Sequence, residues 1–490
     1  MFEFNLRYDG SSRFSPDSRW GLFPSFSAGW RISEEEFMKD IDWLSNLKLR
    51  ASWGKLGNNS IGNYEWQALY GSGYNYAFNS NKSNGLAMTT FSNYALEWEE
   101  TSITNIGLDF GVLNNRLNGT IEVYDKKTDG ILYRPDMYMS LGTASGPRQN
   151  IAEVTNRGIE MTLNWQDRIG KVEYRVSGNF AYNQNKVSKY KGELQRGWVT
   201  DENGNRIYQT NIGDVSTGGS TRVIEGKMIN EYYMLQPYKG NGNGFNADGT
   251  VNINGGPRDG MIRTVDDMKW LNAMVGAGYK FYPRQNVSKS GIWYGDYIYA
   301  DLNGDGVYGN DADNEFQGCS NVTKYNFGLQ ASANWKGFDF SMNWSGAAGF
   351  KIYYYRLALN SSATIKGYAI GEAIANDHYF FDPKNPNDPR TNLSSKNPRL
   401  TNNSGNDQSG MTQSSVHLQK GDYIKLKNLT IGYTLPAVLS KKVYAQNIRF
   451  FASGENLFTI TGYEGMDPEM RTAVGYSTMR QYAFGVNITF

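Results

Sequence analysis

The feature that most constrains this chain is a two-residue alternation of apolar and polar side chains, which recurs from one end of the sequence to the other. The closing stretch QYAFGVNITF, residues 481–490, shows it clearly, because Tyr482, Phe484, Val486, Ile488 and Phe490 share one parity. A period of two is the period of a β-strand and not of a helix. Each such strand has one apolar face, which either a protein core or lipid must cover.

About a dozen segments of strand length show this alternation, and clusters of Asn, Gly, Asp and Pro separate them. Short turns such as LNNRLN (113–118) and WKGFD (335–339) join some neighbours, whereas two connections, at about 188–320 and 349–420, are very long. A compact soluble domain rarely carries structureless loops of that size, but outer-membrane barrels have short periplasmic turns and long extracellular loops. We therefore predict an all-β chain that forms an antiparallel transmembrane β-barrel with long extracellular loops at these two places.

Composition agrees with a barrel and excludes other classes. The net charge of +1 gives no support to nucleic-acid binding. No apolar run approaches the roughly 18–20 residues of a spanning helix. The mean hydropathy of −0.59 is compatible with a barrel, because only every second residue of a spanning strand needs to be apolar. Tryptophans at predicted strand ends fit interfacial girdles; these are Trp20, Trp30, Trp98, Trp165 and Trp335. A soluble β-sandwich or glycan-binding β protein with an aromatic core is the alternative. The single Cys319 cannot form an internal disulfide.

Several stretches show more than the apolar–polar alternation, because they resemble signature segments of one family. They are YDGSSRFSPDSRWGLFPSFSAGWRISEE (8–35), WLSNLKLRASWGKLGN (43–58), YADLNGDG (299–306), GDYIKLKNLTIGYTLP (421–436), IRFFASGENLFTITGYEGMDPE (448–469) and the closing YAFGVNITF. Together they resemble the SusC/RagA family of TonB-dependent outer-membrane transporters, in the family's order and over the whole chain.

The resemblance implies a 22-stranded barrel around an N-terminal plug, a SusD-like surface lipoprotein as partner, and import of glycans or oligopeptides with energy from the TonB complex. It also implies that the terminal Phe490 is an assembly signal in the bacterial outer membrane. About twelve strands cannot close such a barrel, and the start MFEFNLRYDG has no signal-peptide pattern. We therefore expect the C-terminal barrel portion, with the plug and the TonB-binding segment absent from this chain. A truncated gene product, a non-transporting fragment and one half of a split receptor are alternatives.

The sharpest local motif is DLNGDGVYGNDAD (301–313). Asp301, Asn303 and Asp305 alternate as in an EF-hand loop, with Val307 placed to offer its carbonyl, which predicts a Ca²⁺ site. The usual carboxylate at the twelfth position is displaced, because Asp311 and Asp313 flank Ala312. The alternative is a turn in which these side chains cap their own backbone. No other cofactor is required.

We do not expect an enzyme, because the two histidines, His378 and His417, lie in polar, loop-like segments without catalytic spacing and are expected at the surface. Aromatic residues of the long loops are the candidates for contact with substrate or partner. They are Trp293, Tyr294, Tyr297, Tyr299, Tyr353, Tyr354 and Tyr355. These rings would stack on sugar rings or peptide side chains, or would instead pack against the lipoprotein. The prolines within residues 378–401 argue against regular strands there.

Overall fold

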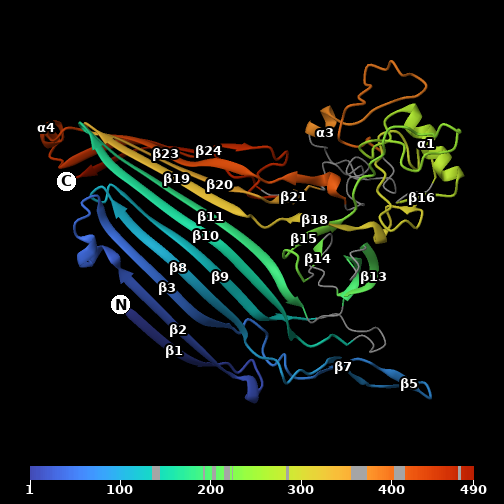
Figure 1. Cartoon of the computed structure of the whole chain (residues 1–490), viewed down its shortest axis with the longest axis horizontal. Coiled ribbons are helices and arrows are strands. Elements are labelled where there is room, and N and C mark those ends of the chain that lie inside the picture. Colours follow the sequence, from blue (N-terminus) through green and yellow to red (C-terminus); the bar gives the residue numbers. More distant parts are fainter. Residues whose placement is uncertain are drawn as a thin grey trace.

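A computed structural model describes residues 1–134, 144–190, 194–200, 206–213, 221–222, 225–282, 286–354, 372–401, 414–472 and 476–490. Its main element is one twelve-stranded antiparallel sheet (Figure 1). In sheet order the strands are β1 (Phe2–Gly10), β2 (Trp20–Arg31), β3 (Leu44–Asn58), β8 (Glu99–Val112), β9 (Leu117–Tyr133), β10 (Gln149–Ile169), β11 (Val172–Tyr190), β19 (Tyr325–Trp335), β20 (Phe338–Ala348), β23 (Tyr423–Thr434), β24 (Asn447–Thr461) and β25 (Gln481–Thr489). The predicted all-β barrel wall is confirmed, with β1 and β25 as its two edge strands.

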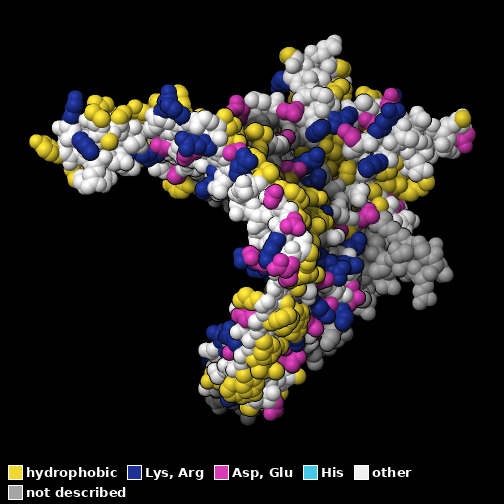
Figure 2. Space-filling model, turned by 60° about the vertical axis from the view of Figure 1, so that its left-hand side comes forward, with side chains coloured by type: hydrophobic (Ala, Val, Ile, Leu, Met, Phe, Trp, Pro, Cys, Tyr) yellow, Lys and Arg dark blue, Asp and Glu magenta, His cyan; other side chains and the backbone are white. Residues whose placement is uncertain are grey.

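The alternation in the sequence becomes the two faces of this sheet. Phe450 of β24 lies between Tyr433 of β23 and Val486 of β25, so apolar residues form rows across neighbouring strands. This face is open to the surroundings, since Phe484 is 83% exposed. Figure 2 shows apolar side chains gathered in a broad patch on the lower part of the molecule. An apolar face without a protein cover is what a lipid-facing barrel wall requires.

Short and long connections alternate, as the sequence predicted. The turns at 113–116, 170–171 and 336–337 lie at one end of the sheet, whereas the connections at 59–98, 191–324 and 349–422 lie at the other. Both chain termini are at the short-turn end, and the loop structures project from the opposite end (Figure 1). Most wall strands exceed the roughly 9–11 residues that a tilted strand needs to cross a bilayer.

Aromatic residues gather at the short-turn end of the wall. Phe338 lies 6.2 Å from Trp335 and 4.5 Å from Tyr433, measured between ring centroids. Trp30 at this end of β2 is exposed, as expected for an interfacial girdle, and so is Trp20 at the loop end of the same strand. Trp98 is different, because it packs against Phe14 and Phe23 and donates its indole N–H to the Arg19 carbonyl. For Trp98 the girdle prediction is wrong, and its role is to pack the loops at the opposite end.

The long loops contain secondary structure of their own, which corrects the expectation of structureless connections. Their strands are β4 (Leu69–Ser72), β5 (Tyr76–Phe78), β6 (Asn81–Ser83), β7 (Leu86–Thr90), β12 (Leu194–Thr200), β13 (Arg206–Gly213), β14 (Thr221–Arg222), β15 (Glu231–Met234), β16 (Lys280–Phe281), β17 (Val307–Tyr308), β18 (Glu315–Ser320), β21 (Lys351–Tyr353) and β22 (Leu418–Lys420). Among the described residues these loops also contain the α-helices α1 (Val265–Gly276) and α3 (Glu372–Asn376), whereas α4 (Ala437–Ser440) lies between β23 and β24 at the short-turn end. Short 3₁₀ helices cover Pro16–Ser18, Ile32–Glu34, Glu36–Met38, Asp311–Asp313, Ser415–His417 and Lys441–Val443.

Helix α1 organises the largest of these loop structures. Thr264 caps its first turn in a reciprocal capping box with Asp267, and Gly278, at φ +97°, lies just beyond its end. Trp270 and Met274 of α1 are fully buried. No helix among the described residues is long and apolar enough to cross a membrane.

Candidate functional site

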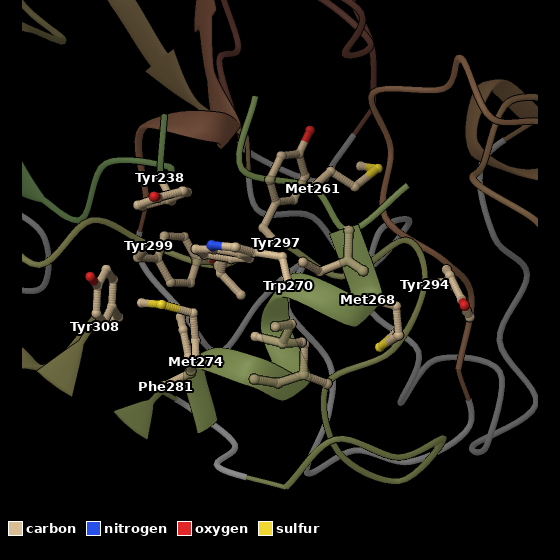
Figure 3. Close-up of a cluster of buried hydrophobic side chains, with 14 of the residues drawn as sticks. Tyr238, Met261, Met268, Trp270, Met274, Phe281, Tyr294, Tyr297, Tyr299 and Tyr308 are labelled. Atoms are coloured by element: carbon tan, nitrogen blue, oxygen red, sulfur yellow. The ribbon is translucent and has the colours of Figure 1, made fainter. Parts of the chain in front are cut away.

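Two of the predicted contact residues lie inside the core of the loop structure around α1, which we call the loop core. Figure 3 shows Tyr297 and Tyr299 grouped with Trp270 and Tyr238. Tyr299 is 1% exposed, and the Tyr297 hydroxyl donates to the Lys396 carbonyl at 2.8 Å. Burial raises the pKa of Tyr297 to about 12. Direct stacking of these two rings on a substrate is therefore contradicted, because neither ring is available at the surface.

The second predicted aromatic group is divided between two other clusters. Tyr353 of β21 is buried beside Tyr232 and Met234, and Tyr354 packs edge-on against Tyr463 at 5.5 Å between ring centroids. Tyr353 is therefore a packing residue as well, which corrects its assignment to ligand contact. Tyr355 lies outside the described residues.

Trp293 and Tyr294 have a different environment, because both line an open groove of about 910 Å³. Lys289 lies on the same side as Trp293 and Tyr294. The other wall comes from α3 and the segment after it, whose lining residues are Ala375, Asn376, His378, Tyr379, Phe380, Phe381, Asp382, Pro383, Pro389, Arg390, Thr391, Asn392, Arg399 and Leu400. We call this space the outer groove. The proline-rich segment, residues 378–401, is irregular, as predicted. Among the described residues it contains one antiparallel bridge, between Phe380 and Asn392.

The acidic loop at 301–313 is held by hydrogen bonds to its own backbone. Asp301 accepts from the amides of Gly304 and Gly306, and the buried Asp313 accepts from those of Leu302, Gly309 and Asn310. Burial raises the pKa of Asp313 to about 6, although these bonds act in the opposite sense. Among the described residues, no three His, Cys, Asp or Glu side chains form a group that could hold a metal ion. The Ca²⁺ site stays a prediction that this arrangement does not favour.

Charged residues on the polar face of the sheet form ion pairs that span three strands. Arg449 of β24 donates to both carboxylate oxygens of Asp339 on β20, at 2.9 and 2.5 Å. Gly432 of the intervening β23 lies beneath this contact. In the same way Arg50 of β3 pairs with Glu122 of β9 across Gly107 of β8. A Cβ at Gly432 would lie 2.5 Å from an Asp339 carboxylate oxygen, and one at Gly107 would lie 2.7 Å from the Arg50 guanidinium carbon, so these charged side chains would have to move.

A buried charge cluster also holds the connection between β24 and β25. The Lys425 ammonium, on a side chain 2% exposed, donates to Asp467 at 2.9 Å and to Glu469 at 2.8 Å. Lys427 also pairs with Glu469, and Thr478 donates to Asp467. Sequence reasoning missed this cluster, although the lysines in an otherwise apolar strand were a usable signal, because a buried lysine needs carboxylate partners.

The two histidines do not form a catalytic set. His417 is buried and packs its ring 6.1 Å from that of Tyr353, which corrects its expected surface position. His378 is partly buried at the outer groove, with its Nδ1 3.0 Å from the Ile374 carbonyl oxygen.

Comparison with known proteins shows what this chain is similar to. Residues 1–214 match the family model described as TonB dependent receptor-like, beta-barrel. This match covers less than half of the 490-residue chain. The match agrees with the twelve-stranded wall and with the resemblance of the signature segments.

Similarity to TonB-dependent receptors extends over the whole chain. TonB-dependent receptor P39 of Formosa agariphila is 29% identical over 511 residues, covering 99% of this chain and 44% of the relative. TonB-dependent receptor SusC of Bacteroides thetaiotaomicron is 28% identical, covering 100% of this chain and 42% of the relative. The chain therefore spans less than half the length of these relatives.

Two solved structures share the fold of this chain. The RagAB peptide importer in its 'open-open' state matches with a TM-score of 0.70 at 22% identity, covering 100% of this chain and 45% of that chain. The RagAB peptide transporter matches with a TM-score of 0.69.

Proposed function

We propose that this chain forms part of the barrel wall and the extracellular loops of an outer-membrane importer. The observation that carries this proposal is that one face of the sheet is apolar and uncovered while the opposite face is polar. The chain is also similar over its whole length to TonB-dependent receptors. A wall of this kind places its polar face toward a lumen through which a solute passes. The loop core and the outer groove then face the cell exterior.

The proposal includes partners that supply what a wall alone does not. A SusD-like surface lipoprotein would cover the loop end, and the TonB complex would supply energy through an N-terminal part. The proposed cargo is a glycan or an oligopeptide. Support comes from the relative named SusC and from the fold shared with the RagAB peptide importer.

Orientation is tested by epitope tags in two turns at opposite ends of the sheet. One tag enters the exposed turn at Asn79 and Ser80, and a control tag enters the short turn at Gly170. Antibody applied to intact cells is expected to label the first tag only, and both tags after permeabilisation. Labelling of the Gly170 tag on intact cells would contradict the proposed orientation.

Transport itself is tested by deleting the gene and restoring it. We expect uptake of fluorescent oligosaccharide or peptide cargo to fall on deletion and to return with the restored gene. Uptake that is unchanged in the deletion strain would contradict the proposed function even if the tag experiment succeeds.

A further inference from the structure

A short segment between β23 and β24 exposes apolar and basic side chains together at the short-turn end of the wall (Figure 1). It consists of α4, the 3₁₀ helix Lys441–Val443 and Tyr444, and we call residues 437–444 the basic turn. Its large apolar side chains are all exposed, and these are Val438, Leu439, Val443 and Tyr444. An exposed apolar group of this kind marks an interaction surface, because burial of its side chains would release a favourable hydrophobic free energy.

The basic turn is fixed to the wall, so the exposure of its side chains is a property of the fold. Ser440 is fully buried, and its carbonyl accepts a hydrogen bond from the amide of the buried Ala445 at 3.1 Å. The next residue, Gln446, donates its amide to the Thr489 carbonyl of β25 at 2.7 Å. Two small buried residues therefore hold the segment, and its large side chains point outward.

The basic turn adjoins the apolar face of the sheet. Ile448 of β24 has the parity of Phe450, which lies on that face, and α4 packs against β24. Ile448 is buried, whereas its partner on β25, Ile488, is half exposed. This difference indicates that the basic turn covers the apolar side of β24. Its exposed apolar side chains therefore continue the surface that the wall presents to lipid.

Three exposed lysines gather at the same place. Lys441 and Lys442 belong to the basic turn, and Lys336 belongs to the turn between β19 and β20. The two turns are neighbours, because the Thr434 amide, shortly before α4, donates to the Gly337 carbonyl at 2.7 Å. Within the described part of the chain, none of the three ammonium groups has a carboxylate partner.

The surroundings of these lysines leave their charge available to an anion. Asp339, the carboxylate nearest to Lys336 in the sequence, is already held by Arg449. The Lys336 ammonium lies 5.3 Å from the centre of the exposed Trp335 ring. Tryptophan and lysine together are typical of the level at which the headgroups of a bilayer meet its acyl chains.

From these observations we propose that the basic turn is a binding surface for anionic phospholipids in the leaflet on the short-turn side of the membrane. Val438 and Leu439 would lie among the acyl chains close to the headgroups, and the three lysines would bind phosphate oxygens. Lipid is favoured over a protein partner because the apolar group is continuous with the lipid-facing surface of the wall. This inference rests on the proposed membrane wall and adds a lipid site that lies outside the path of the cargo.

Contact with lipid is measured with a nitrobenzoxadiazole label on single cysteines of the complete receptor, in a cysteine-free background that includes Cys319→Ser. The receptor is reconstituted in vesicles of phosphatidylcholine and phosphatidylglycerol. Val438→Cys carries the label on the basic turn, and Phe450→Cys is the lipid-facing reference. Lys171→Cys is the control, because the turn of Gly170 and Lys171 has no apolar side chain.

Brominated lipid is expected to quench the label strongly at positions 438 and 450 and weakly at position 171. A label at position 438 that only aqueous iodide quenches, or that neither quencher reaches, would overturn the proposal, since water or protein would then cover the basic turn. A label at position 450 that brominated lipid does not quench would overturn the membrane wall itself, and this inference with it.

Recognition of charge is measured with bromine on one lipid at a time, at equal mole fractions. Brominated phosphatidylglycerol should quench the label at position 438 at least about twofold more than brominated phosphatidylcholine, because lysines near a bilayer attract anionic lipid. The combined variant Lys336→Gln, Lys441→Gln and Lys442→Gln should remove this difference, and Lys171→Gln should preserve it. Equal quenching by the two lipids when all three lysines are present would overturn the assignment to anionic phospholipid.

Discussion

Arg449 on β24 reaches Asp339 on β20 by passing over Gly432, the residue of β23 that lies between them. The pair thus fastens three strands at the short-turn end of the polar face. The glycine leaves room for this geometry, because a Cβ on Gly432 would lie 2.5 Å from one Asp339 carboxylate oxygen and 2.6 Å from an Arg449 nitrogen and would displace both side chains. Arg50 and Glu122 form a second ion pair that crosses a glycine, Gly107, in the same way.

Gly432→Ala is expected to displace the Arg449–Asp339 pair and to destabilise the wall by about 0.5–1 kcal/mol, the scale of a partly exposed ion pair. The measurement is the temperature at which the folded band disappears on a heat-modifiability gel. Gly178→Ala is the control, since the nearest atom to its added Cβ would be 3.9 Å away. Equal effects of the two variants would show that any added methyl group destabilises these strands.

Lys425→Met tests the buried charge cluster. Removing the ammonium leaves Asp467 without its buried cation, and breaking a buried pair typically costs about 3–5 kcal/mol. We expect residues 462–472 to exchange backbone amide protons much faster, as measured by mass spectrometry. Lys441→Met, at an exposed position, should leave exchange unchanged. Normal protection in Lys425→Met would mean that backbone contacts alone hold this connection.

The same cluster predicts a limited pH dependence. Burial disfavours ionisation of Asp467 and Glu469, but hydrogen bonds from Lys425 and other groups outweigh the effect of burial. The pKa of Asp467 therefore lies below its ordinary value of 3.8, and that of Glu469 lies below 4.5. A carboxyl whose pKa is lower in the folded state contributes stability above its unfolded pKa and loses it as the pH falls through the folded value. Protection of the backbone amides of residues 462–472 against exchange should therefore be constant from about pH 8 to about pH 5 and should decrease at pH values below about 4. A loss between pH 7 and pH 5 would contradict this assignment.

Trp270→Ala is expected to unfold the loop core while the wall remains assembled. Trp270 is fully buried and packs on Tyr238 at 5.2 Å between ring centroids, and deletion of a buried Trp typically costs about 3–5 kcal/mol. Limited proteolysis should cleave between residues 225 and 282 in the variant only, with an unchanged heat-modifiable band. Tyr76→Ala, at an exposed position, is the control. Loss of the folded band in Trp270→Ala would show that loop core and wall unfold together.

The acidic loop gives a test of the predicted Ca²⁺ site. Asp313→Ala should expose residues 301–313 to protease, because three backbone amides lose their acceptor. Since the loop is held by its own hydrogen bonds, we expect a calcium chelator to leave wild-type protection unchanged. Chelator-induced cleavage, reversed by Ca²⁺ and absent with Mg²⁺, would establish the metal site.

The sequence by itself determined the wall, because alternation at period two is a local property of each strand. It predicted the strand faces and the order of short and long connections, and its signature segments showed a resemblance to the SusC/RagA family. The tertiary structure alone decided which aromatics are buried. Trp293 and Tyr299 are six residues apart and equally aromatic, yet one lines a groove and the other lies in the loop core. That difference depends on α1 and on residues 376–400, which are distant in sequence. The pairing of Lys425 with Asp467 and the crossing over Gly432 likewise depend on strand register, which is fixed only when neighbouring strands are in place.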